Sequence, residues 1–128
     1  MNTQAQDLIA LVDRGEPRAL EAALEQGADP DGADRWGVTA LARAAARGDL
    51  EAVEILLARG ARVDKLSDAG NSALMAAAAR GDLAIMTALL EAGADPRQAN
   101  KWGFGPEDWG SWPANAREVR DLLRSRSG

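Results

Sequence analysis

The sequence predicts an all-α fold, a helical solenoid in which four helix–turn–helix units stack on one another and are joined by hairpin-like loops. Three observations predict it. The chain of 128 residues repeats itself at a fixed offset of 33 residues. Each unit contains two short segments with helical apolar spacing, separated by a glycine. Alanine accounts for 28 residues, and alanine both favours helices and lets neighbouring backbones approach closely.

The internal repeat is clearest between the two central units. Residues 36–41 (WGVTAL) align with 69–74 (AGNSAL), and 47–50 (RGDL) align with 80–83 (RGDL). The two outer units match less well, as capping units do when one side faces water. We therefore expect a single domain over residues 1–128, made of an N-terminal cap, two central units and a C-terminal cap: 1–33, 34–66, 67–99 and 100–128.

The second unit shows how each element is predicted. Thr39 is expected to cap a first helix, which Gly48 then interrupts. Asp49 is expected to cap a second helix that runs to about Arg59. Gly60 follows at the position where a left-handed residue ends a helix.

The predicted second helix carries one apolar face, formed in this unit by Val53, Leu56 and Leu57 at i, i+3 and i+4. A helix this short cannot bury such a face alone, so neighbouring units must stack to close the core. Glu16 and Asp82 stand where Asp49 stands in its unit, and both are predicted to be helix caps.

A family resemblance is carried by the residues that recur in this order in the second unit: Gly37-x-Thr39-Ala40-Leu41-Ala42-x-Ala44-Ala45, Gly48, Val53, Leu56-Leu57 and Gly60-Ala61. With the 33-residue period, they resemble the ankyrin repeat over essentially the whole chain. The chain departs from the family where a Thr-Pro-Leu-His segment is usual. Residues 39–42 are Thr-Ala-Leu-Ala, and 72–75 are Ser-Ala-Leu-Met. The histidine that usually ties the hairpin loop to the helix is therefore absent.

The resemblance implies a surface that binds proteins, formed by the hairpin tips and the inner faces of the first helices. Tryptophan and arginine dominate the energetics of such surfaces. Carried over by repeat position, the candidate protein-binding residues are Arg14, Arg35, Trp36, Val38, Arg47, Asp68, Asn71, Arg80, Lys101, Trp102, Phe104 and Trp112. Four smaller or acidic neighbours share these positions: Asp13, Ala46, Ala69 and Ala79.

The aromatic residues have different expected roles. Trp36 lies at a hairpin tip in mid-array and is the predicted hot spot. Trp109 matches a buried first-helix position, which favours a place in the core. Trp102, Phe104 and Trp112 leave two alternatives open: they contact a partner, or they fold over one another and seal the C-terminal end.

Three arginines, Arg14, Arg47 and Arg80, are spaced 33 residues apart and are expected to line one edge of the stack. They could form a ladder that binds carboxylates in bidentate pairs. Alternatively, each simply ends a first helix, where a positive charge is favoured by about 0.3–1 kcal/mol.

The composition argues against catalysis. The chain has no cysteine and no histidine. A thiolate nucleophile, an imidazole base and the usual ligands of zinc, haem and iron–sulfur clusters are therefore missing. We expect no enzyme activity, no cofactor and no metal site.

Charge points to the kind of partner. The net charge is −5, with 15 basic and 20 acidic residues, and residues 1–114 alone carry −7. Such a field repels nucleic acid and favours a basic protein. No apolar run approaches the roughly 18 residues that span a membrane, and the first residues do not resemble a secretory signal. We expect a cytoplasmic protein, and the abundance of arginine, alanine and glycine hints at a bacterial gene.

The expected function is that of a non-catalytic, protein-binding module, monomeric on its own. The most specific hypothesis is a stoichiometric inhibitor. In this it is similar to small bacterial ankyrin proteins that act as immunity proteins and block a toxin or secreted effector. The alternative is an adaptor or assembly subunit, which would bind its client and leave it active.

Overall fold

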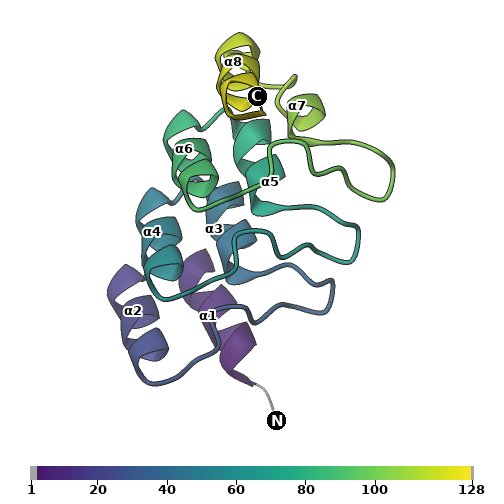
Figure 1. The fold of residues 1–128 in the computed structure, drawn as a ribbon. Coiled ribbons are helices and arrows are strands. Elements are labelled where there is room, and N and C mark those ends of the chain that lie inside the picture. The colour runs from purple at the N-terminus through teal and green to yellow at the C-terminus, as the bar shows by residue number, and fades with distance from the viewer. Residues whose placement is uncertain (1–2, 128) are drawn as a thin grey trace.

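The computed structural model describes residues 3–127 and shows an all-α stack in which the helices of each unit lie side by side (Figure 1). Its helices within this range are α1 (Thr3–Asp13), α2 (Pro17–Glu25), α3 (Ala40–Arg47), α4 (Leu50–Ala58), α5 (Ala73–Arg80), α6 (Leu83–Glu91), α7 (Pro106–Trp109) and α8 (Ala116–Ser127). The predicted all-α repeat solenoid is confirmed.

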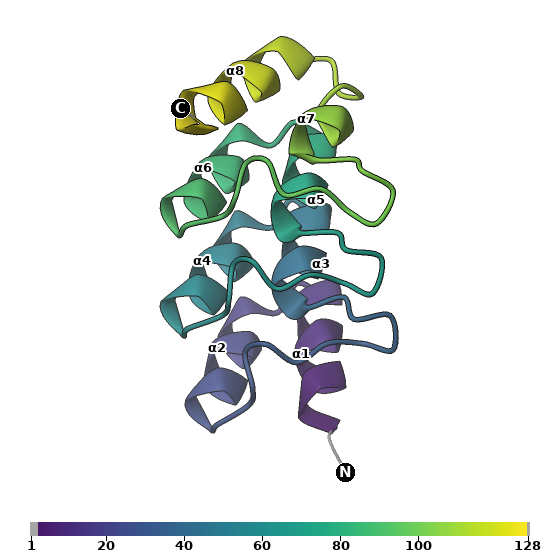
Figure 2. The same cartoon turned by 45° about the vertical axis from the view of Figure 1, so that its right-hand side comes forward.

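The helices form two columns. The first helices of the units, α1, α3, α5 and α7, contact one another in succession, and so do α2, α4, α6 and α8. The loops that connect consecutive units project from the side of the first helices, as Figure 2 shows. The described residues contain no β-strand; one isolated antiparallel bridge joins Ala33 to Thr39 within the first hairpin loop. This arrangement leaves one surface that is made of loops and first helices alone.

Helix boundaries in the second unit follow the predicted signals. The Thr39 side chain accepts a hydrogen bond from the N–H of Ala42, and the Asp49 carboxylate accepts one from Ala52, both at 3.1 Å. Gly48 has a φ of 74°, the left-handed conformation that lets the chain turn between α3 and α4. In the third unit, Asp82 likewise accepts from the N–H of Ile85.

The predicted cap at Glu16 is wrong. Its side chain makes no capping bond and instead forms an ion pair with Arg14. Pro17 occupies the first position of α2, where its fixed φ suits a helix and its missing N–H removes one donor that would need a cap. The proline therefore begins this helix without help from the preceding side chain.

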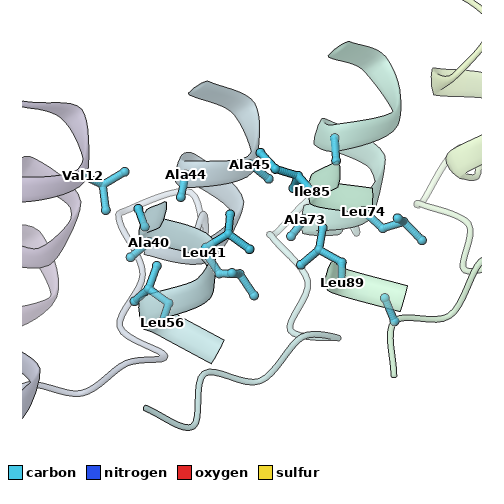
Figure 3. Packing of buried hydrophobic residues seen from close by; sticks show 14 of the residues in the cluster. Val12, Ala40, Leu41, Ala44, Ala45, Leu56, Ala73, Leu74, Ile85 and Leu89 are labelled. Carbon is cyan, nitrogen blue, oxygen red and sulfur yellow. The ribbon is translucent and has the colours of Figure 1, made fainter. Parts of the chain in front are cut away.

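The core runs along the contact between the two columns (Figure 3). Leu41 and Leu74, at equivalent positions of α3 and α5, are almost completely buried. Each contributes about 1.5–3 kcal/mol to the free energy of unfolding through burial. Alanines such as Ala44 and Ala77 are fully buried beside them. Their small side chains let the first helices lie close together.

The C-terminal end is closed by α8. Val119 and Leu123 of this helix are buried against the core, and α8 packs on α6. The three candidate aromatic residues near this end are exposed, Trp102 by 68%, Phe104 by 53% and Trp112 by 81%. The alternative in which these side chains seal the end is therefore wrong.

Candidate functional site

Each hairpin is held in shape by one side chain at the same repeat position. The Asp34 carboxylate accepts from the backbone N–H groups two and four residues ahead, at 2.9 and 3.0 Å. The Asn100 amide oxygen does the same in the last hairpin, also at 2.9 and 3.0 Å. Ser67 accepts from the N–H of Asn71 at 3.2 Å in the hairpin between them. The loops are thus braced although the chain has no histidine.

Neighbouring hairpins are also bonded to one another. The N–H of Asp68 donates to the carbonyl of Trp36 at 2.9 Å, and the N–H of Lys101 donates to that of Ala69 at 3.0 Å. The Asn100 side chain adds a bond to the Asn71 side chain at 2.9 Å. The loops between the units, residues 26–39, 59–72 and 92–105, are therefore connected to one another. We call the surface that they form the hairpin ledge.

A groove of about 450 Å³ runs between this ledge and the first helices. We call it the central groove. Its floor is formed by small or apolar side chains of α3 and α5, and Trp109 of α7 stands at one end. Its lining residues are Asp34, Trp36, Val38, Ala42, Arg43, Ala46, Ser67, Asn71, Ser72, Met75, Ala76 and Trp109.

Polar groups are anchored beside this apolar floor. The Arg43 guanidinium pairs with Asp34 at 3.2 Å and with Asp13 at 3.6 Å. Its Nε and the indole Nε1 of Trp109 are buried donors that have no hydrogen-bond acceptor among the described residues. A buried donor without an acceptor costs about 1–3 kcal/mol. Both of these donors belong to residues that line the groove.

Trp36 stands at the rim of the central groove. Its side chain is 60% exposed, and the guanidinium carbon of Arg35 lies 4.9 Å from its ring centroid. This distance is within the range of a cation–π contact. The indole is therefore partly supported by its neighbour while most of its surface faces solvent.

A second hollow, of about 330 Å³, lies beyond Trp109. We call it the aromatic hollow. Its lining residues are Phe104, Asp108, Trp109, Ser111 and Trp112. Trp109 is half-buried, packs against the core and lines both hollows, so the predicted core role describes only part of its surroundings. Trp102 lines neither of them.

The three arginines expected to line one edge of the stack have different surroundings. Arg14 pairs with Glu16. Arg80 donates to the carbonyl of Ala46 at 3.4 Å, so it covers the end of α3. Arg47 is exposed and makes no ion pair within the described part of the chain. These three arginines therefore do not form a uniform ladder of free guanidinium groups.

Comparison with protein families gives a match to the model for ankyrin repeats, in three copies, over residues 8–100. The chain belongs to the ankyrin-repeat family. Ankyrin repeats are protein–protein interaction modules, and the family is generally non-catalytic. The match ends at the last hairpin, so α7, α8 and the aromatic hollow lie outside it. A search of curated proteins gives no match.

The ankyrin array brings some predicted residues together and separates others. Trp36, Val38 and Asn71 line the central groove, while Phe104 and Trp112 line the aromatic hollow. The remaining candidates line neither: Arg14, Arg35, Arg47, Asp68, Arg80, Lys101 and Trp102.

Residue-by-residue prediction missed Arg43 and Met75 as groove residues, together with the bracing position occupied by Asp34, Ser67 and Asn100. The repeat itself carries the signal for that position. All three are short polar residues spaced 33 residues apart. Each lies at the position from which a side chain can accept hydrogen bonds from the backbone N–H groups of its hairpin.

No helix within residues 3–127 has the length and apolar character that a membrane span requires. No group of three or more acidic side chains among those residues is placed to hold a metal ion.

Proposed function

We propose that this ankyrin array binds one basic protein across its central groove and hairpin ledge, and inhibits that protein by occupying its working surface. An immunity protein that neutralises a toxin or effector acts in this way. The observation that supports the proposal is an apolar groove with one large, exposed aromatic side chain, Trp36, in its lining. Phe104 and Trp112, which are also exposed, line the neighbouring aromatic hollow.

Exposed aromatic side chains at a groove have a physical reason to bind. Each buries a large area while losing few rotatable bonds, which is why tryptophan is enriched among interface hot spots. Trp36, Trp102, Phe104 and Trp112 are all more than half exposed, and all lie in the last part of a hairpin or beside α7. They would supply the apolar centre of an interface on the ledge side.

Charge supports a basic partner. The net charge of −5 raises the encounter rate with a positively charged protein at low salt. The ledge carries carboxylates such as Asp31 and Asp68 beside cations such as Arg35 and Lys101, so the charge that favours a basic partner is that of the whole chain. Nucleic acid and anionic membranes would be repelled by the same field, so we propose neither as a partner.

The inhibitory role follows from how a rigid surface of this size acts. A stable interface buries about 800 Å² on each partner. An occupant of that size excludes substrate from any site beneath it, with no chemistry of its own. We further propose that the array works in the cytoplasm and is monomeric until it meets its partner.

An adaptor or assembly role is favoured by one separate observation. Trp102 is 68% exposed and lines neither hollow, so it offers a second apolar contact outside the groove. An adaptor needs two contact surfaces that can be occupied together, whereas an inhibitor needs only one.

The experiment begins with capture of a partner on the immobilised chain, followed by purification of both proteins. Isothermal titration calorimetry then gives stoichiometry, and the partner's own activity is measured with and without the chain. The inhibitor proposal expects one-to-one binding and loss of activity at one equivalent. Full activity in the saturated complex would reject inhibition and support the adaptor.

A further inference from the structure

The aromatic hollow differs from the central groove in chemistry. Rings of Phe104, Trp109 and Trp112 line it, together with the short polar Ser111 and one carboxylate, Asp108. Trp109 is half-buried and fixed against the core, while the other two rings are mostly exposed. Since Trp109 also lines the central groove, a bound segment could lie in the groove and reach this hollow.

The carboxylate in the hollow, that of Asp108, is not paired with a cation of the described residues. One oxygen of Asp108 accepts from the N–H of Gly105 at 2.8 Å, at the start of α7. Asp108 makes no ion pair within residues 3–127. Arg124 of α8 is paired instead with Glu107 at 2.7 Å, and this contact raises the pKa of Arg124 above its ordinary value. Among the residues that the structure describes, none of those lining the hollow is basic.

The rings of the hollow are likewise without a cation. Aromatic faces carry negative potential and attract guanidinium and ammonium groups within about 6 Å. In the described part of the chain, one such contact occurs, between Arg35 and Trp36. The exposed rings of Phe104 and Trp112, and the part of Trp109 that lines the hollow, are therefore available to a cation from outside.

We propose that the aromatic hollow receives a cationic side chain, an arginine of the bound protein, between its aromatic rings and beside the Asp108 carboxylate. The inference rests on the proposed binding of a basic protein and adds where one of its charges is held. A planar guanidinium suits the hollow because it can stack on a ring and donate in plane to a carboxylate at once.

Other occupants fit less well. A purely apolar side chain would remove water from Asp108 without offering it a partner, which is unfavourable for a charged group. An acidic side chain would be repelled by the same carboxylate. A second copy of this chain could present one of its own exposed arginines, and the test below includes that outcome.

The direct test is a titration followed by nuclear magnetic resonance of the four indole N–H signals, assigned by single Trp→Phe variants. The probe is N-acetyl-arginine N′-methylamide. N-acetyl-citrulline N′-methylamide is the matched control, because it has nearly the same shape and no charge. We expect arginine to shift the Trp109 and Trp112 signals and to bind at least about twofold more tightly than citrulline, with the Trp102 signal unchanged. Equal binding of the two probes, or no shift at Trp109 and Trp112, would overturn the inference.

Three variants localise the effect. Trp112→Leu removes an exposed ring of the hollow, and we expect about two- to fivefold weaker binding of the arginine probe. Trp102→Leu removes an exposed tryptophan outside the hollow and is the matched control for the arginine probe alone, whose affinity it should leave unchanged. Asp108→Asn keeps an oxygen for the N–H of Gly105 and loses the charge, so the preference for arginine over citrulline should fall. Unchanged binding by Trp112→Leu and Asp108→Asn, with folding confirmed by circular dichroism, would contradict the proposed site.

Failure of this inference is distinguishable from failure of the proposed function. If a protein partner binds the array tightly and Trp112→Leu leaves its affinity unchanged, the array is a binder but the hollow holds no cation. If analytical ultracentrifugation shows a dimer that Trp112→Leu dissociates, the hollow is covered by a second copy, and the inference is overturned in that way.

Discussion

Arg80 of the third repeat covers Gly48 of the second. Its guanidinium lies so close to Gly48 that a Cβ there would clash with it, and it donates to the carbonyl of Ala46 at 3.4 Å, in the last turn of α3. The side chain thus contacts the C-terminal end of the preceding first helix, where carbonyl groups lack helical partners and a positive charge is favoured. A residue predicted for binding is also part of the joint between repeats.

The next joint repeats this relation with different chemistry. The Asn115 side chain covers Gly81 and donates to its carbonyl at 2.8 Å. Pro113 also lies within 2.9 Å of where a Cβ on Gly81 would be. Gly15, at the same repeat position, has the same left-handed backbone, but a Cβ added there would meet no atom of the described residues within 4 Å beyond its chain neighbours. Alanine substitutions at these glycines therefore distinguish two effects on stability: the strain of a left-handed backbone, which they share, and the clash of the new Cβ with neighbouring atoms, which differs.

Gly81→Ala should be more destabilising than Gly15→Ala. Both substitutions place an alanine in a left-handed conformation, which costs about 1–2 kcal/mol. Only Gly81→Ala also displaces Asn115 and meets the Pro113 ring, so we expect a further loss of about 1 kcal/mol or more. Urea unfolding of the two variants measures the difference. Equal destabilisation would show that the covering side chains contribute nothing.

Asp82→Ala should lower the free energy of unfolding by about 1 kcal/mol, because it removes the acceptor for the N–H of Ile85 at the start of α6. Glu16→Ala is the matched control, since Glu16 stands at the same repeat position and makes no capping bond. Chemical denaturation should show it within about 0.5 kcal/mol of the wild type. A comparable loss in both variants would contradict the assignment of the caps.

Asn100→Ala should loosen the last hairpin. It leaves two backbone N–H groups without their acceptor and removes the bond to Asn71, a loss of about 1–3 kcal/mol. Asn100→Asp keeps the acceptor, as Asp34 shows in its own hairpin, and should lose less. Amide hydrogen exchange at Trp102 and Phe104 reports the loop directly. Equal exchange in Asn100→Ala and the wild type would argue against bracing.

Much of the fold was predictable because the repeat fixes where helices begin and end. The caps at Thr39, Asp49 and Asp82 are local patterns, and all three are confirmed. Glu16 failed because the proline that follows it already begins α2. Pro17, which has no counterpart in the other units, removes the need for a capping side chain at Glu16.

The site was less predictable, because it depends on contacts between repeats. Trp109 matches a core position, yet α7 is only four residues long, so its last residue stays half-buried and lines two hollows. Arg14, Arg47 and Arg80 share one repeat position but differ in partner. Glu16 pairs with Arg14, whereas the aspartates after the other two cap the next helix. The repeat position of a residue therefore predicts where its side chain lies in the stack, but it does not predict which residue that side chain contacts.

Filling the central groove should weaken partner binding without weakening the fold. Ala46 is exposed on α3 and lines the groove, so Ala46→Trp occupies space that a partner needs. We expect at least about a tenfold loss of affinity, measured by calorimetry. Ala58→Trp adds the same side chain at an exposed position of α4, in the other column, and should bind as the wild type does. Equal affinity of both variants would place the partner elsewhere.

The most direct test of the central claim is the affinity of the purified partner for Trp36→Ala. Trp36 is the exposed aromatic residue that lines the groove, and most of its side-chain surface faces solvent. Gln26→Ala, at the exposed position that follows α2, is the control. A dissociation constant raised at least about tenfold by Trp36→Ala alone is the predicted result. Wild-type affinity in both variants would contradict the claim that this face binds the partner.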